Sequence, residues 1–191
     1  ASWCFVSTEE IRAAVARSGV APELVEEIVM GCVLPAGQGQ APARQAALAA
    51  GLPLGAGATT VNKMCGSGMK AAMLGHDLIL AGSADVVVAG GMESMSSAPY
   101  LLPKARAGYR MGHGQVMDHM FLDGLEDAYD KGRLMGTFAE DCAGHFNFTR
   151  SAQDEFAIAS TTRAQAAINN GDFTWEVTPV TVSGRKGDVV V

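Results

Sequence analysis

One cysteine in this sequence stands where its side chain could act as a nucleophile. Cys65 lies in the run VNKMCGSGMK (residues 61–70), between a β-favouring stretch and an apolar helical pattern. A thiol at such a turn meets helix N–H groups that have no intrahelical partner and the positive end of the helix dipole. Both favour the thiolate, which is the nucleophilic form. Gly66 and Gly68 leave room for an acyl group beside the sulfur. We therefore predict that Cys65 attacks a carbonyl carbon and that nearby backbone N–H groups stabilise the oxyanion.

Other nucleophiles and other uses of this run are less well supported. Ser67 is an alternative nucleophile, but no GxSxG frame surrounds it. The glycines match neither the Walker phosphate loop nor the dinucleotide fingerprint. Cys4, Cys32 and Cys142 form no CxxC pair, so zinc-site spacing is absent and we expect no metal. These three cysteines are expected to be small buried hydrophobic residues.

The four histidines do not supply a recognisable catalytic base. His76 falls in the most apolar helical pattern, so we expect a hydrogen-bonded core histidine there. His113, His119 and His145 fall in loop-like sequence and are expected to be solvated.

The elements that must position Cys65 follow from hydrophobic patterning in the first half of the chain. Short apolar runs predict strands covered on both faces, and the run after Cys65 is apolar all round, which predicts a helix buried on every side. Ser7 and Glu10 have capping-box spacing and predict a helix start at Ser7. The expected order is helix 7–19, strand 28–34, helix 42–50, strand 58–64, helix 65–81 and strand 85–91. A strand, a helix and a strand in this order predict a parallel, right-handed β-α-β unit.

The second half of the sequence has a different character. Residues 96–150 contain scattered Gly, Pro, Met and His without a long periodic segment. A helix is predicted over 151–168 and an edge strand over 177–182, where Pro179 cannot donate a hydrogen bond. We place a boundary near residue 95, between a layered α/β part over 1–95 and an inserted, looser α+β part over 96–191.

Composition narrows the classes of function. The 191 residues are 48% hydrophobic and 18% charged, which indicates a packed globular chain. A net charge of −6 without a basic cluster argues against nucleic acid as a partner. No apolar run approaches the length of a membrane span, and no signal peptide is visible, so we expect a cytoplasmic protein. The start at Ala1 and the strand-like end at Val191 both suggest a cut chain.

Six segments of the sequence resemble motifs of the thiolase family, specifically its acetyl-CoA acetyltransferase branch. The Cys65 run resembles the family's acyl-enzyme signature, and GQAPARQ resembles its GQNPARQ-like segment with Ala41 in place of Asn. The resembling segments are 61–80, 39–45, 88–96, 108–112, 135–141 and 149–157. The resemblance covers nearly the whole chain from about Val25.

The resemblance implies a fold, a reaction and a substrate class. The fold would be a layered α-β-α thiolase half with an inserted α+β loop domain, fragmentary at both ends and lacking the family's first strand. Cys65 would take an acyl group from acyl-CoA and pass it to the enolate of a second acetyl-CoA, or to CoA in the reverse thiolysis. Leu134 and Met135 would line the pantetheine and acyl pocket. No cofactor is implied beyond coenzyme A thioesters as substrates, and the family forms homodimers or homotetramers.

The resemblance also implies that some catalytic groups of the family are missing from these 191 residues. The family's activating His and its second Cys–His set lie in a C-terminal half whose motifs are absent here, so this chain alone is expected to be inactive. That half would cover apolar helix and sheet faces, so the isolated chain is expected to be poorly soluble. Three alternatives stay open: a 3-ketoacyl-CoA thiolase of longer-chain β-oxidation, a related condensing enzyme, or a non-catalytic fragment that acts only in assembly. Leu134 stands where biosynthetic members have His, which leaves the acyl-chain preference open.

Overall fold

The structure, a computed structural model, describes residues 4–184 and 187–191. The chain forms two compact units, Ala1–Gly124 together with Val180–Val191, and Leu125–Pro179. We describe each unit by itself. The structural division thus falls after Gly124, and the domain boundary expected near residue 95 stays a prediction.

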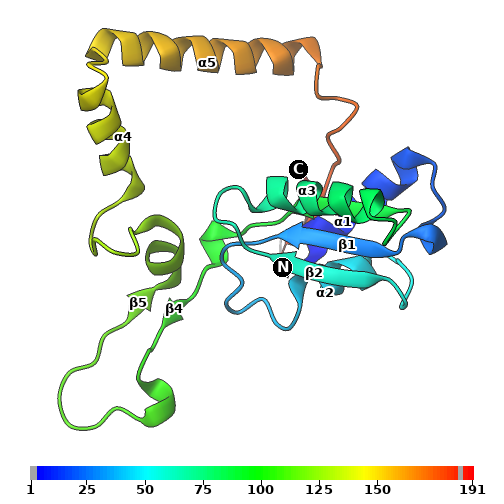
Figure 1. Cartoon of the computed structure of the whole chain (residues 1–191), viewed down its shortest axis with the longest axis horizontal. Coiled ribbons are helices and arrows are strands. Elements are labelled where there is room, and N and C mark those ends of the chain that lie inside the picture. The colour runs from blue at the N-terminus through cyan, green and yellow to red at the C-terminus, as the bar shows by residue number, and fades with distance from the viewer. Residues whose placement is uncertain (1–3, 185–186) are drawn as a thin grey trace. The chain divides into compact units, whose positions relative to one another are not determined.

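A parallel sheet of order β2–β1–β3 forms the centre of the first unit (Figure 1). Its strands are β1 (Glu27–Gly31), β2 (Gly57–Val61) and β3 (Val87–Gly91). Glu27 on the central strand pairs with Gly57 on one side and with Val87 on the other. The carboxyl ends of all three strands therefore lie at one edge of the sheet. The predicted α/β class and its parallel β-α-β arrangement are confirmed.

Helices cover both faces of this sheet. In Figure 1, α2 (Pro42–Ala49) and α3 (Ser67–Leu80) lie on opposite sides of the strands, and α1 (Cys4–Ser18) packs against α2. Alternate residues of β1 face opposite sides. Ile28 and Met30 join the core formed with α1 and α2, while Gly31 faces the start of α3. The first unit is therefore a three-layered α-β-α structure.

Several predicted boundaries shift in the structure, each for a local reason. β1 ends at Gly31 rather than residue 34, because the backbone amides of Val33 and Leu34 bond to a side chain described below. β2 ends at Val61 rather than residue 64. The start predicted at Ser7 is wrong: α1 already includes Cys4, and Ser7 is buried within the helix, so Ser7 does not cap it.

The second unit contains two helices. α5 (Arg150–Asn170) begins after Thr149, whose hydroxyl accepts a hydrogen bond from the Ala152 N–H at 3.1 Å. It ends at Gly171 in the left-handed conformation, so the helix predicted over 151–168 is confirmed. α4 (Met135–His145) was not predicted. Its sequence contains two glycines and lacks a long apolar period, so patterning gave no signal.

Short elements complete the described chain. β4 (Tyr100–Leu101) pairs with β5 (Met117–Asp118), and a turn of π-helix follows at Phe121–Leu125. β6 (Thr181–Gly184) pairs with β7 (Gly187–Val190). The predicted strand over 177–182 begins only at Thr181, after Pro179. Among the described residues, no helix combines the length and apolarity that a membrane crossing requires.

Candidate active site

The turn between β2 and α3 presents Cys65 at the carboxyl edge of the sheet. Cys65 is exposed, and it lies between the end of β2 at Val61 and the first residue of α3, Ser67. Helical bonding begins with the Lys70 N–H, which donates to the Gly66 carbonyl at 2.8 Å. The sequence prediction of an accessible thiol at a helix start therefore agrees with the geometry.

Glycines allow the start of α3 to lie directly on the strands. A Cβ atom at Gly31 would come 2.4 Å from the carbonyl carbon of Ser67 and 2.5 Å from the nitrogen of Gly68. A Cβ atom at Gly91 would come 3.3 Å from the Cα atom of Gly68. No residue with a side chain fits at Gly31 without a backbone shift. This contact fixes the height of the Cys65 turn above the sheet.

The backbone before Cys65 has an unusual conformation that side chains support. Met64 has a φ of 49° in the left-handed region, which is costly for a residue with a side chain. The Asn62 side-chain oxygen accepts a hydrogen bond from the Met64 N–H at 2.9 Å. The Ser67 hydroxyl accepts one from the Lys63 N–H at 2.9 Å. These bonds hold the turn that aims Cys65 outward.

Ser67, the alternative nucleophile, has a structural role. Its side chain is buried, and its hydroxyl donates to the Met64 carbonyl at 2.5 Å while accepting from Lys63. A hydroxyl that is buried and bonded twice is poorly placed to attack a substrate. The geometry therefore favours Cys65 over Ser67.

Glu93, which patterning alone did not single out, organises the loop after β1. Its carboxylate accepts hydrogen bonds from the Val33 N–H at 2.8 Å and the Leu34 N–H at 2.9 Å. The Cys32 thiol lies 3.7 Å from the same carboxylate and 3.7 Å from the Gln38 side-chain oxygen. Burial, and then the negative charge of Glu93, raise the pKa of Cys32 to about 11.

These surroundings predict that Cys32 resists alkylation. With a pKa of about 11, about one thiol in a thousand is ionised at pH 8, and the side chain is 1% exposed. We expect iodoacetamide to modify Cys142, which is exposed, and to leave Cys32 unmodified at pH 8. Cys32 should react only as the pH approaches 11 or when urea unfolds the chain. Mass spectrometry of tryptic peptides measures both rates, and equal rates at pH 8 would contradict this assignment.

Two predictions about histidines are wrong. His119 is buried rather than solvated: its Nδ1 lies 2.6 Å from an oxygen of Asp123, and its Nε2 accepts from the Ala36 N–H at 3.4 Å. The pair ties the π-helical turn to the loop after β1. His76 is exposed rather than in the core, with 68% of its side chain accessible, because the face of α3 that carries it points away from the sheet.

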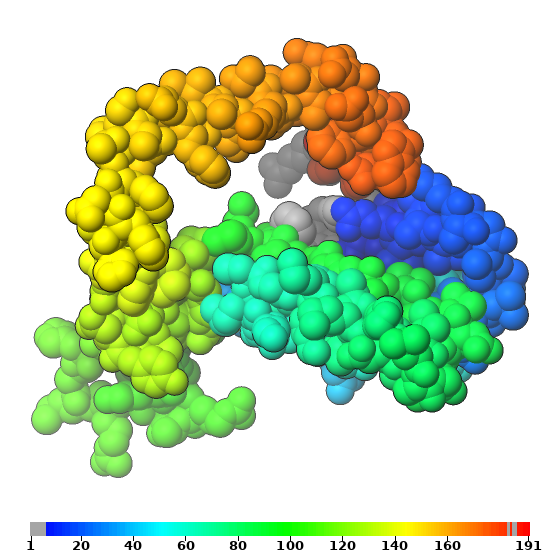
Figure 2. Space-filling model, turned by 45° about the horizontal axis from the view of Figure 1, so that its top comes forward, coloured from blue at the N-terminus to red at the C-terminus, as the bar shows by residue number. Residues whose placement is uncertain are grey.

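The helix that follows Cys65 is also less buried than its composition predicts. The buried residues of α3 are all small, namely Ser67, Ala71 and Gly75. The large apolar side chains of its outer face are exposed, namely Met69, Met73, Ile79 and Leu80. Figure 2 shows spheres of this segment, coloured blue-green to green, at the surface that faces the viewer. The prediction of burial on every side is wrong within this structure.

The predicted substrate-binding residues lie in the second unit, at the start of α4. Leu134 precedes the helix in an extended conformation, and Met135 is its first residue. Both side chains are exposed. The loop before them is well bonded: the Asp127 N–H donates to the Arg133 carbonyl at 2.8 Å, and a Glu126 oxygen accepts from the Gly132 N–H at 2.6 Å.

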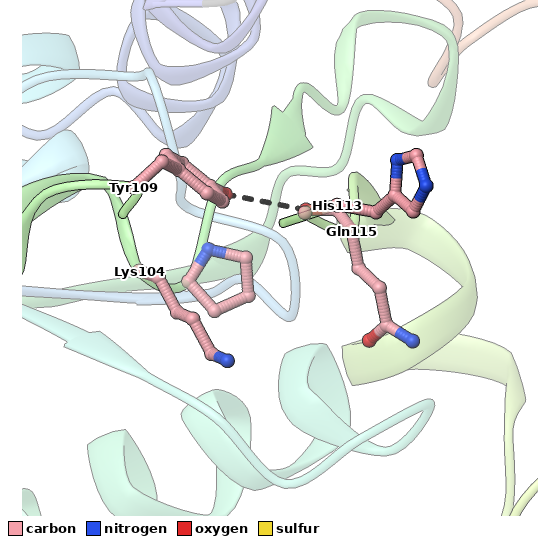
Figure 3. Close-up of a pocket in the computed structure, with 6 residues that line it drawn as sticks. Lys104, Tyr109, His113 and Gln115 are labelled. Carbon is pink, nitrogen blue, oxygen red and sulfur yellow. Dashed lines mark hydrogen bonds between the residues drawn. The ribbon is translucent and has the colours of Figure 1, made fainter. Parts of the chain in front are cut away.

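A small pocket in the first unit lies in the loop between β4 and β5. It has a volume of about 270 Å³ and is lined by Lys104, Tyr109, His113, Gln115 and their neighbours. Figure 3 shows the Tyr109 hydroxyl directed at the main chain of Gln115, to whose carbonyl it donates at 3.3 Å. Drug-sized ligands occupy pockets of roughly 300–1,000 Å³. Cys65 does not line this pocket. The pocket is therefore not a candidate site for chemistry at the Cys65 thiol.

Comparison with known proteins identifies the family. The thiolase N-terminal domain family matches residues 4–191. The chain belongs to the thiolase family. Among curated relatives of this thiolase chain, "Acetyl-CoA acetyltransferase" of Cupriavidus necator is 53% identical over 94% of the chain and 46% of the relative.

Two further relatives carry similar names. "Acetyl-CoA acetyltransferase 2" of Arabidopsis thaliana is 54% identical over 93% of the chain and 44% of its own length. "Acetyl-CoA acetyltransferase" of Pseudomonas aeruginosa is 51% identical over 93% of the chain and 45% of its own length. The thiolase chain therefore spans about half the length of the curated relatives that it matches.

Proposed function

We propose that the protein containing this thiolase chain is an acetyl-CoA C-acetyltransferase that works through an acyl thioester on Cys65. One observation carries the proposal: the exposed Cys65 thiol stands at the start of α3, at the carboxyl edge of the parallel sheet. That is where ligands of open α/β sheets bind. The relatives are named acetyl-CoA acetyltransferases, which supports acetyl as the transferred group and CoA as its carrier.

The proposed reaction has two steps that meet at the Cys65 sulfur. In the first, the thiolate attacks the thioester carbonyl of acetyl-CoA, the carbonyl carbon–sulfur bond to CoA breaks, and CoA leaves as its thiolate. In the second, the enolate carbon of another acetyl-CoA attacks the acetyl-Cys65 carbonyl, which releases Cys65 and forms acetoacetyl-CoA. Thiolysis is the reverse sequence. The oxyanion of each step would accept hydrogen bonds from N–H groups at the start of α3.

The proton transfers of this reaction are assigned to residues outside the chain. Among the described residues, no histidine is hydrogen-bonded to Cys65, and the buried His119 is bonded to Asp123. We propose that the base that ionises Cys65 and the acid–base group for the second acetyl-CoA come from other parts of the protein. Acyl transfer between thioesters needs no metal or redox cofactor, so acyl-CoA and CoA are the proposed ligands.

Trapping the acyl intermediate tests the proposal. The protein as its gene encodes it would be mixed with acetyl-CoA alone, quenched in acid, and digested for mass spectrometry. We expect one acetyl group on the peptide that contains Cys65 and none on the peptide that contains Cys142, which is also exposed. Acetylation of neither peptide, or of both at the same rate, would refute the proposed function. The last result would favour a role in assembly, consistent with the exposed apolar face of α3.

A second candidate function, cleavage of longer 3-ketoacyl-CoA substrates, rests on Leu134. Its apolar side chain stands where the resemblance implies the acyl pocket and where biosynthetic members have His. We propose that Leu134 and Met135 contact the pantetheine and acyl groups, and that the intact protein forms homodimers or homotetramers.

Replacing Leu134 by histidine should favour short acyl chains. An apolar pocket gains about 1–3 kcal/mol for each substrate methylene that it buries, and an imidazole would reduce that gain. We expect L134H to lower kcat/KM for 3-ketohexanoyl-CoA about tenfold relative to acetoacetyl-CoA. Leu134→Met is the control that keeps an apolar side chain of similar volume. An unchanged substrate ratio in L134H would show that Leu134 does not contact the acyl chain.

A further inference from the structure

Two side chains connect the carboxyl ends of the three parallel strands, and their bonds lead to Cys65. Glu93 follows β3 and Asn62 follows β2, and both bond to the same residue after β1, Val33. The Glu93 carboxylate accepts from the Val33 N–H at 2.8 Å, and the Asn62 side-chain N–H donates to the Val33 carbonyl at 3.4 Å. Val33 is therefore held at both its amide and its carbonyl.

The connection continues from Asn62 to the nucleophile. The other end of the same amide, the Asn62 side-chain oxygen, accepts from the Met64 N–H at 2.9 Å. Met64 is the residue in the left-handed conformation, and Cys65 is the next residue along the chain. A side chain that holds the Met64 N–H in place therefore sets the direction in which the backbone enters Cys65.

The arrangement is more specific than loop packing requires. A single carboxylate satisfies two consecutive amides, Val33 and Leu34, and charged acceptors make the stronger hydrogen bonds. At the amino ends of the strands, Glu26 makes a comparable connection. One of its oxygens accepts from the Asp85 N–H at 2.5 Å and from the Val86 N–H at 3.4 Å. The Glu26 connection lies at the amino ends of the strands, away from Cys65, whereas the Glu93 connection lies at the carboxyl ends and leads to Cys65.

We propose that Glu93 and Asn62 are positioning residues that hold the Cys65 thiol in its reactive orientation through the Val33 peptide and the Met64 N–H. The proposal rests on the proposed function of Cys65 as acyl acceptor. Neither residue touches the substrate in this scheme. Each acts by keeping the turn before Cys65 in a conformation that its own backbone preference opposes.

Three substitutions separate the parts of this connection. Glu93→Gln keeps the side-chain shape but turns an N–H toward Val33 or Leu34, so one amide loses its acceptor. Asn62→Asp keeps an oxygen for the Met64 N–H but places an oxygen against the Val33 carbonyl. Asn62→Ala removes both bonds. Glu26→Gln is the matched control, because it weakens an equivalent connection that does not lead to Cys65.

The experiment measures Cys65 in two ways in the protein as its gene encodes it. The first readout is the single-turnover rate of Cys65 acetylation by acetyl-CoA, and the second is the rate of Cys65 alkylation relative to Cys142 in the same molecule. We expect E93Q and N62A to slow acetylation about 10–100-fold with little change in KM, and N62D to lie between N62A and the wild type. The alkylation ratio should change at least about threefold. E26Q should leave both readouts within about twofold of the wild type.

The outcomes separate this proposal from the proposed function. If acetyl-CoA does not acetylate Cys65 in the wild type, the proposed function is refuted. The alkylation ratio of Cys65 to Cys142 then tests the positioning role by itself. Unchanged ratios in both E93Q and N62A would overturn the positioning proposal even if Cys65 is the acyl acceptor. An effect of E26Q as large as that of E93Q would also overturn it, because general loosening of the sheet would then explain both.

Discussion

Replacing Cys65 by serine should eliminate the acetyl-enzyme and lower kcat by at least about 10³-fold, since removing a catalytic nucleophile costs factors of this size or larger. A serine hydroxyl at this turn has a far higher pKa than a thiol, so it is not ionised at neutral pH. The structure predicts little change in folding, because Cys65 is exposed and no described packing depends on its sulfur. Acetoacetyl-CoA formation and cleavage, measured on the protein as its gene encodes it, check this result.

The matched control for C65S is Cys142→Ser. Cys142 is likewise exposed, but it lies on α4 in the second unit. This variant should keep wild-type kcat, and the thermal unfolding midpoints of both variants should match that of the wild type. Retention of more than a tenth of wild-type activity in C65S would exclude Cys65 as the acyl acceptor.

Replacing Gly31 by alanine should be the most destabilising single-methyl change in the sheet. The new Cβ atom would lie 2.4 Å from one backbone atom of α3 and 2.5 Å from another, so the helix must move away from β1. Overpacking against rigid backbone costs about 2–4 kcal/mol of unfolding free energy. The moved helix start carries Cys65 with it, so acetylation of Cys65 should slow as well. Urea unfolding and acetyl trapping measure the two effects.

Gly55→Ala is the control for this substitution. A Cβ atom at Gly55 meets no atom within 4 Å, and its φ is not in the left-handed region. The change should therefore alter the unfolding free energy by less than about 1 kcal/mol, in the stabilising direction if at all. If G31A and G55A unfold at the same urea concentration, α3 does not rest on β1 as closely as the structure has it.

The sequence predicted the sheet and the exposed cysteine at the turn into α3, because both depend on local patterns. Apolar runs marked β1, β2 and β3, and the glycines around Cys65 marked a turn into a helix. Patterning did not predict what Glu93 does, because its role depends on which loop lies across from the end of β3. The burial of His119 escaped prediction for the same reason: its partner Ala36 is far away in sequence.

The helix α3 shows why composition overestimated burial. Its apolar residues surround the helix, but its buried residues are the small ones, Ser67, Ala71 and Gly75. A Cβ atom at Gly75 would already come 3.1 Å from a Val87 methyl group, so this position has no space for a large side chain. The larger residues, such as Met69 and Leu80, therefore face away from the sheet. Periodicity predicts which residues are on an apolar helix, but it does not predict which of them are small enough to lie closest to the strands.

The order of the strands also determines when the loops around Cys65 acquire their partners during synthesis. Central strand β1 pairs with β3, and Glu27 is the partner of Val87. At about 5–20 residues per second, the ribosome needs about 3–12 seconds to make the roughly sixty residues between them. During that interval both edges of β1 are unpaired until β2 is made, one edge stays unpaired until β3 is made, and Glu93, which accepts from the Val33 N–H, does not yet exist. Asn62 is synthesised before Cys65 and Glu93 after it, so the nascent chain carries the thiol before the carboxylate that bonds to the loop after β1.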